Sequence, residues 1–183
     1  MGAVRVLFGM LCLAVVCSSG LFSSGVVGVD GRERRAARRV VEAAQKEVGV
    51  RESTENAGVR VDEYNAYVGF RKVAWCASFV SWCHGQAGYS APNTAWSPAL
   101  FPESRLQKEA LPGMVMGIYF PKLKRIAHCG IVESVNGNYV HTIEGNTNVA
   151  GGREGIGVFR RIRHRKLVSR YADWVSKLPP VPP

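Results

Sequence analysis

The chain contains no internal repeat, and only the tail at residues 179–183 is low in complexity. It has 20 glycines among 183 residues, and 46% of its residues are apolar. A collagen-like chain needs glycine at every third position, and a disordered chain has too few apolar residues to form a core. Both classes are therefore excluded, and the length fits one packed domain.

No apolar run is long enough to span a membrane, which takes about 20 residues. The apolar run Val6–Cys17 follows a single charge, Arg5, and precedes a stretch of small residues that ends at Gly28. This order is typical of a secretory signal peptide. We therefore expect residues 1–28 to direct export to the cell envelope or beyond, and residues 29–178 to form the mature domain.

The sequence allows several signal cleavage sites and raises the question of a lipid anchor. Cleavage after Gly20, Gly25 or Gly28 is compatible with the sequence. A lipoprotein anchored through Cys17 is less favoured, because Val16 stands where a small residue usually precedes the modified cysteine. The mature form is thus expected to have no membrane span.

Cysteine is scarce, with five in the chain, two of them in the expected signal peptide. The other three, Cys76, Cys83 and Cys129, are an odd number at irregular spacing, unlike a disulfide framework. An exported protein with an unpaired cysteine invites the question of a reactive thiol.

Acidic residues are outnumbered, 14 against 24 lysines and arginines, so the formal charge is +10. This surplus favours an anionic partner without identifying it. The alternating basic run 159–166 is first interpreted as a strand with a solvated face, and it could also hold an anionic wall polymer. No nucleic-acid partner is expected, because the chain has no recognisable groove-reading motif.

Helical periodicity comes first along the chain and strand-like segments follow. Helices are expected at 32–48, 61–68 and 74–88, and a proline-rich loop at 89–112. An antiparallel meander is expected from segments 114–120, 126–135, 139–144 and 156–162, and a short helix at 168–177. This order predicts an α+β domain with helices packed on an antiparallel sheet.

Cys76 is the first candidate for chemistry. It lies at the first turn of the expected buried helix, where unsatisfied backbone N–H groups favour a thiolate. Cys83, about 10 Å further along the helix, is interpreted as a core residue. A cysteine nucleophile needs a histidine to accept its proton and a third group to orient that histidine.

His128 is the best-placed base. His84 lies late in the same helix as Cys76, and His164 lies in the basic run. His128 begins a strand, and the next strand ends with Glu144 and Asn146.

The register of these two strands decides which side chains share a face with His128. A two-residue loop, Asn136-Gly137, would turn Glu144 away from His128. A three-residue loop, 136–138, would set His128 opposite Asn146, with Glu144 diagonal on the same face. We predict this even register or an equivalent bulge.

Four sequence strings together resemble the CHAP domain, a family of cysteine- and histidine-dependent amidohydrolases and peptidases related to papain-like enzymes. The strings are WCASFVSWC (75–83), TAWSP (94–98), AHCGIV (127–132) and TIEGNT (142–147). The resemblance covers roughly residues 35–163. It implies a papain-like fold and cleavage of amide bonds in peptidoglycan, in stem peptides, in cross-links or between glycan and peptide.

The resemblance also implies roles for single residues. Cys76 becomes the nucleophile, His128 the general base and then acid, and Glu144 the group that orients His128. Asn146 becomes an accessory polar group or the orienting group itself. The backbone N–H of Cys76 becomes part of the oxyanion hole.

Two tryptophans are candidates for contact with substrate. Trp75 precedes the proposed nucleophile, and Trp96 lies in the proline-rich loop as a possible wall of the substrate groove. The chain departs from the family at Met114, where many members have aspartate, and at Cys129, where an aliphatic residue is usual. Cys129 is expected near the site but on the opposite face of its strand.

No cofactor is implied, and no metal site is expected. The cysteines and histidines lack a recognised metal-ligand spacing, and no acidic loop like the calcium site of some relatives precedes Cys76. The alternative to a hydrolase is a non-catalytic wall-binding protein that keeps the fold. Loss of wall lysis with retained wall binding in a Cys76→Ala variant separates the two.

Overall fold

The computed structural model describes residues 31–148 and 155–176. The expected signal peptide, its cleavage points and the proline-rich tail lie outside these residues. Within the described residues the chain is an α+β fold with three α-helices and a six-stranded sheet. The predicted fold class is confirmed.

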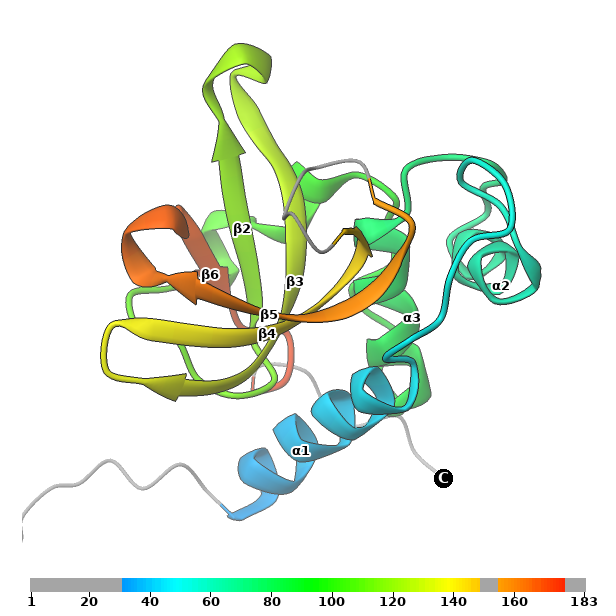
Figure 1. The fold of residues 1–183 in the computed structure, drawn as a ribbon. Coiled ribbons are helices and arrows are strands. Elements are labelled where there is room, and N and C mark those ends of the chain that lie inside the picture. Colours follow the sequence, from blue (N-terminus) through cyan, green and yellow to red (C-terminus); the bar gives the residue numbers. More distant parts are fainter. Residues whose placement is uncertain (1–30, 149–154, 177–183) are drawn as a thin grey trace, which may run out of the picture.

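The three helices form at the positions that the periodicity predicted. They are α1 (Gly31–Lys46), α2 (Val59–Tyr67) and α3 (Cys76–Gln86). α1 buries one apolar face and exposes Arg34, Arg35, Arg38 and Arg39. α3 is buried on almost every side, and packs against β3, β4 and both other helices (Figure 1). α3 is therefore the central helix, and its first residue is Cys76.

The sheet has the spatial order β1-β6-β2-β3-β4-β5, and each recorded pairing is antiparallel. The expected meander is present as β2 to β5, and the loop 89–112 contains two short 3₁₀ turns, Ser97–Leu100 and Glu103–Arg105. The strands are β1 (Leu106–Gln107), β2 (Val115–Phe120), β3 (Arg125–Asn136), β4 (Tyr139–Thr147), β5 (Gly157–His164) and β6 (Arg170–Ala172).

The helix expected at 168–177 is wrong for the residues described there. Arg170–Ala172 is β6, which pairs with β2 on one side and with β1 on the other. Without β6, the edge of β2 would present unpaired backbone groups. Pairing across the sheet therefore overrides the weak helical spacing of this segment.

The turn between β3 and β4 also differs from the expected three-residue loop. Asn136 pairs with Tyr139, so the turn holds only Gly137 and Asn138. A bulge between Val132 and Ser134 then shifts the register by one residue. Beyond the bulge Ile131 pairs with Ile143, which is the predicted even register. It arises from a bulge, the predicted alternative to a three-residue loop.

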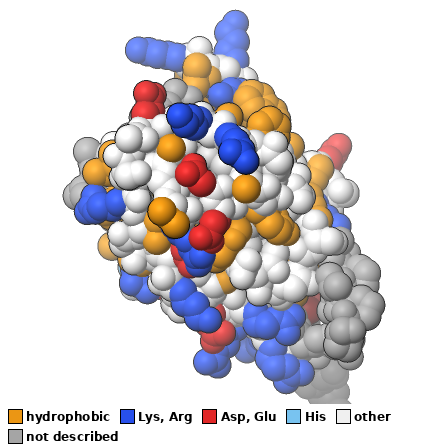
Figure 2. All heavy atoms as spheres, turned by 90° about the vertical axis from the view of Figure 1, so that its right-hand side faces the viewer, with side chains coloured by type: hydrophobic (Ala, Val, Ile, Leu, Met, Phe, Trp, Pro, Cys, Tyr) orange, Lys and Arg blue, Asp and Glu red, His pale blue; other side chains and the backbone are white. Residues whose placement is uncertain are grey.

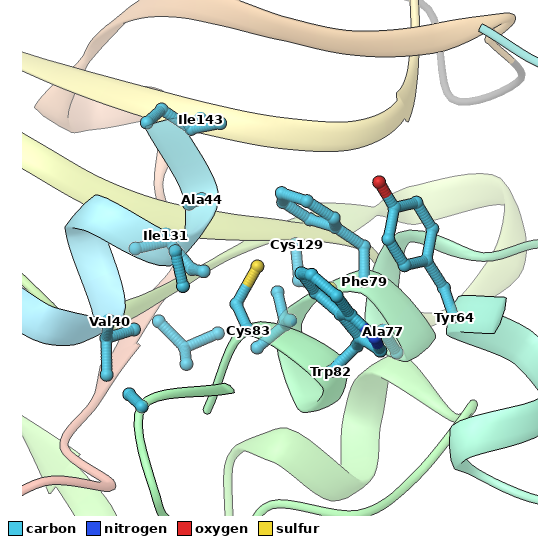
Figure 3. Packing of buried hydrophobic residues seen from close by; sticks show 14 of the residues in the cluster. Val40, Ala44, Tyr64, Ala77, Phe79, Trp82, Cys83, Cys129, Ile131 and Ile143 are labelled. Atoms are coloured by element: carbon cyan, nitrogen blue, oxygen red, sulfur yellow. The ribbon is translucent and has the colours of Figure 1, made fainter. Parts of the chain in front are cut away.

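The main core lies between the helices and one face of the sheet. Figure 3 shows side chains from all three helices meeting side chains of β3 and β4 in one cluster. The ring of Tyr64 packs against three other aromatic rings, with centroids 5.6 Å from Trp75, 5.5 Å from Phe79 and 5.2 Å from Trp82. This packing fixes the N-terminal end of α3, where Cys76 lies.

Lys and Arg side chains are mixed with acidic and apolar side chains on the face shown in Figure 2 and do not form one patch there. Among residues 31–148 and 155–176, no helix combines the length and apolar character needed to cross a membrane.

Candidate active site

Cys76 is buried at the first position of α3, preceded by Trp75 as the N-cap. The first N–H groups of a helix have no partner within the helix and carry a partial positive charge. Ser97, at the start of the 3₁₀ turn Ser97–Leu100, places its Oγ 3.3 Å from Cys76 Sγ. The thiol thus lies between a helix N-terminus and a buried hydroxyl group.

His128 and Glu144 lie together on one face of the β3–β4 pair. His128 Nε2 donates to Glu144 Oε2 at 2.8 Å, and both side chains are almost completely buried. Gly130 makes this approach possible, because a Cβ there would lie 2.5 Å from Glu144 Cγ. The Nδ1 atom of His128 has no hydrogen-bond partner among the described residues, which leaves it for the Cys76 thiol.

Glu144 has further partners that the sequence reasoning missed. Arg163 on β5 binds both carboxylate oxygens, with Nε 2.9 Å from Oε1 and Nη2 2.6 Å from Oε2. Thr142 donates its hydroxyl to Oε1 at 2.6 Å. The strand parity of β5 could have revealed Arg163, because Thr142 pairs with Arg161 and residues 161 and 163 share a face.

The charges of these groups form a coupled set. The Cys129 thiol is the largest influence on the pKa of Cys76, which lies well below its usual value. Burial opposes this lowering, whereas His128 and Ser97 add to it. Burial disfavours the imidazolium of His128, but the Cys76 thiol and the Glu144 carboxylate outweigh this effect and raise its pKa to about 9. The lowered pKa of Cys76 and the raised pKa of His128 both favour a thiolate–imidazolium pair.

Glu144 stays ionised in this buried place. Burial acts to raise its pKa, but hydrogen bonds from Arg163 and His128 lower it to about 2. A carboxylate that accepts several charge-assisted hydrogen bonds is both ionised and fixed in orientation. Glu144 can thus hold His128 and stabilise its positive charge.

Cys129 lies close to the candidate site, as expected. It belongs to the core cluster that faces α3, on the other face of β3 from His128. Burial raises the pKa of Cys129 well above the usual value, and the influence of Cys76 adds to this. Cys129 is therefore the neutral thiol beside a Cys76 thiolate. Cys83 lies in the same core, and all three cysteines are free.

Asn146 does not orient His128. With its amide placed to satisfy both neighbours, it donates to the Gly155 carbonyl at 2.9 Å and accepts from the Trp75 backbone N–H at 3.3 Å. Its backbone has a φ of 51°, in the left-handed region that asparagine tolerates. Asn146 thus ties the end of β4 to the residue before Cys76.

The expectation that Trp75 contacts substrate is wrong. Its side chain is fully buried, and its Nε1 donates to Glu52 at 3.0 Å. Trp75 packs in the core because it comes directly before a buried helix. Trp96, in contrast, is 53% exposed, and the Arg125 guanidinium lies 4.2 Å from its ring centroid.

A pocket of about 330 Å³ opens beside His128. Arg163 and Lys166 contribute basic groups to its wall, and Ile118 and Leu167 contribute apolar ones. A larger pocket of about 660 Å³ lies between α1 and residues 111–114, and none of the candidate site residues lines it. In the described part of the chain, no group of three or more histidine, cysteine or acidic side chains is arranged to hold a metal ion.

Residues 67–146 match the family model of the CHAP domain, a range that contains Cys76, His128 and Glu144. No curated protein matches the chain.

Two solved structures resemble the fold. One is the crystal structure of Ly7917, with 15% identity over 74% of this chain and 60% of that chain, and a TM-score of 0.45. The other is the crystal structure of Ly7917 with the hydrolyzing product of MDP, with 14% identity over 74% and 61% and a TM-score of 0.43. This chain thus spans less than two thirds of the length of either.

Proposed function

Because residues 67–146 match the family model of the CHAP domain, we propose that this chain is a cysteine hydrolase that cleaves amide bonds in peptidoglycan. The observation that carries the proposal is the buried hydrogen bond of 2.8 Å between His128 and Glu144, together with Cys76 at the N-terminus of α3, where it influences the pKa of His128. Nucleophilic catalysis by a thiol needs these three parts together.

The proposed first half-reaction forms an acyl-enzyme. The Cys76 thiolate attacks the carbonyl carbon of the scissile amide, and the carbonyl oxygen takes the negative charge. The N–H of Cys76, which is free of helical bonds at this position, donates to that oxygen. As the C–N bond breaks, His128 passes its Nδ1 proton to the leaving amine.

The second half-reaction restores the enzyme. Neutral His128 takes a proton from water, the hydroxide adds to the thioester carbonyl, and the carboxylic acid leaves as the thiolate is released. Glu144 remains ionised throughout and holds Nε2. The low pKa of Cys76 and the raised pKa of His128 support a resting enzyme that already holds the ion pair.

The expected location follows from the sequence. Residues 1–28 support export, so the protein acts in the cell envelope or outside the cell, and its positive charge suits an anionic wall polymer. Export is tested by N-terminal sequencing of protein recovered outside the cytoplasm. A terminus after residue 20, 25 or 28 agrees with the proposal, and an intact Met1 contradicts it.

A comparison of wild type with one variant distinguishes a hydrolase from a non-catalytic wall-binding protein. Wild type and a Cys76→Ala variant are incubated with purified cell walls, and both loss of turbidity and sedimentation with the walls are measured. We expect the variant to sediment like wild type while its lysis falls to the background. Lysis by both proteins removes Cys76 from the mechanism, and lysis by neither supports a wall-binding protein.

A further inference from the structure

The buried carboxylate of Glu144 is shared between two cationic partners. His128 Nε2 approaches Oε2 at 2.8 Å, and Arg163 Nη2 approaches the same oxygen at 2.6 Å. Arg163 Nε holds the other oxygen at 2.9 Å. The two hydrogen bonds from one planar guanidinium fix the plane of the carboxylate, which a single contact cannot do.

Arg163 also covers Glu144 on the side of the pocket. The side chain of Glu144 has no exposed surface, and that of Arg163 is 11% exposed. His128 and Arg163 both line the pocket of about 330 Å³, whereas Glu144 does not. Arg163 therefore lies between the carboxylate and the solvent that fills this pocket.

We propose that Arg163 is a positioning residue that acts through Glu144 to orient His128 toward Cys76. The effect of Arg163 on catalysis rests on the proposed function. The effect of Arg163 on the reactivity of Cys76 can be measured without any substrate. Arg163 does not touch the reacting atoms. It fixes the carboxylate that fixes the imidazole.

Removal of the guanidinium has a defined electrostatic consequence. Burial favours protonated Glu144, and the hydrogen bonds from Arg163 are the largest influence against it. In an Arg163→Gln variant the pKa of Glu144 therefore rises. Protonated Glu144 cannot stabilise the imidazolium, so the thiolate–imidazolium pair is lost at a higher pH on the acid side than in wild type.

The control lies on the same strand. Arg160 pairs with Glu133 through two contacts of 3.1 Å on the exposed surface. These contacts involve neither His128 nor Glu144. Arg160→Gln removes a paired arginine from β5 without touching Glu144. Arg163→Lys is the second variant: it keeps the charge but not the two parallel hydrogen bonds.

The test measures alkylation of Cys76 by iodoacetamide against pH, with the modified peptide quantified by mass spectrometry. We expect Arg163→Gln to move the acid limb upward and to lower kcat/KM by about 10- to 100-fold, the loss typical of charge-assisted hydrogen bonds. Arg163→Lys keeps the acid limb near its wild-type position with reduced kcat. Arg160→Gln matches wild type in both measurements.

A double-mutant cycle with Glu144→Gln provides the decisive result. If Arg163 acts through Glu144, then Arg163→Gln produces no further loss in a Glu144→Gln background. Independent, multiplicative losses overturn the inference, as does a folded Arg163→Gln or Arg163→Lys variant with the wild-type alkylation profile and kcat. If alkylation shifts as expected but wild type cleaves no peptidoglycan, the inference stands and the proposed function fails.

Discussion

His128 and Glu144 are hydrogen-bonded across β3 and β4 only because a bulge corrects the register of the hairpin. Near the turn, Asn136 pairs with Tyr139, and continuing that register would oppose residue 144 to 131. The bulge between Val132 and Ser134 restores the pairing of Ile131 with Ile143. Glu144 then reaches Nε2 of His128 at 2.8 Å.

Glu144→Gln is expected to shift the alkaline limit of activity downward. Glu144 helps to raise the pKa of His128 to about 9, and the neutral amide removes the charge but keeps the shape. The pKa of His128 then falls, so the imidazolium is lost at a lower pH than in wild type. The pH dependence of kcat/KM checks this result.

Glu133→Gln is the matched control for that substitution. Glu133 lies on β3 and pairs with Arg160, away from His128. Its pH profile should overlay that of wild type. An alkaline limb in Glu144→Gln that stays in place, or moves upward, contradicts the assignment of Glu144 as the orienting group.

Cys129→Ala is expected to make Cys76 less reactive in mildly acidic solution. The Cys129 thiol is the largest influence that lowers the pKa of Cys76, so its removal raises that pKa. Cys76 therefore holds less thiolate at about pH 6, and its alkylation slows. The measurement is the rate of alkylation at Cys76 from pH 4 to 9.

Cys83→Ala separates this effect from damage to the core. Both cysteines are fully buried in the same cluster, so each change should lower the free energy of unfolding by about 1 kcal/mol. Only Cys129→Ala should change the alkylation profile of Cys76. Equal profiles in both variants remove Cys129 from the electrostatics of the site.

The sequence predicted most elements near the site because their patterns are local. Helical periodicity located α3, and Cys76 could be placed at its first turn without tertiary information. Arg163 was missed because its role depends on the register between β4 and β5 and on the length of its side chain. The segment that forms β6 was expected to be a helix because its strand pairing with β2 depends on residues more than 50 positions away.

Trp75 and Trp96 show the limit of reasoning from residue type. Trp75 directly precedes Cys76, Trp96 lies in the proline-rich loop, and both were expected to contact substrate. Trp75 is fully buried against Tyr64, whereas Trp96 is half exposed. Burial of single side chains depends on how α2 and the loop 89–112 pack, which local pattern does not fix.

Trp96→Ala is expected to raise KM with little effect on kcat. An exposed indole that contacts substrate stabilises the bound substrate and the transition state alike, so its loss weakens both. A rise in KM of about tenfold is expected from the loss of an aromatic contact. Michaelis–Menten analysis on soluble wall fragments measures it.

Tyr139→Ala provides the comparison for Trp96. Tyr139 is 51% exposed, similar to Trp96, but lies beside the β3–β4 turn. Its substitution should leave KM unchanged. The alkylation rate of Cys76 should be that of wild type in both variants. A KM for Trp96→Ala equal to that for Tyr139→Ala contradicts a substrate contact at Trp96.

The central claim is that the Cys76 thiolate of this chain breaks amide bonds in peptidoglycan. Its most direct test is mass spectrometry of fragments released from several purified peptidoglycans by reduced wild-type enzyme and by Cys76→Ala. We predict new amine and carboxyl ends at one type of amide bond with wild type and none with the variant. Absence of such ends from every wall type, or their equal release by Cys76→Ala, contradicts the account.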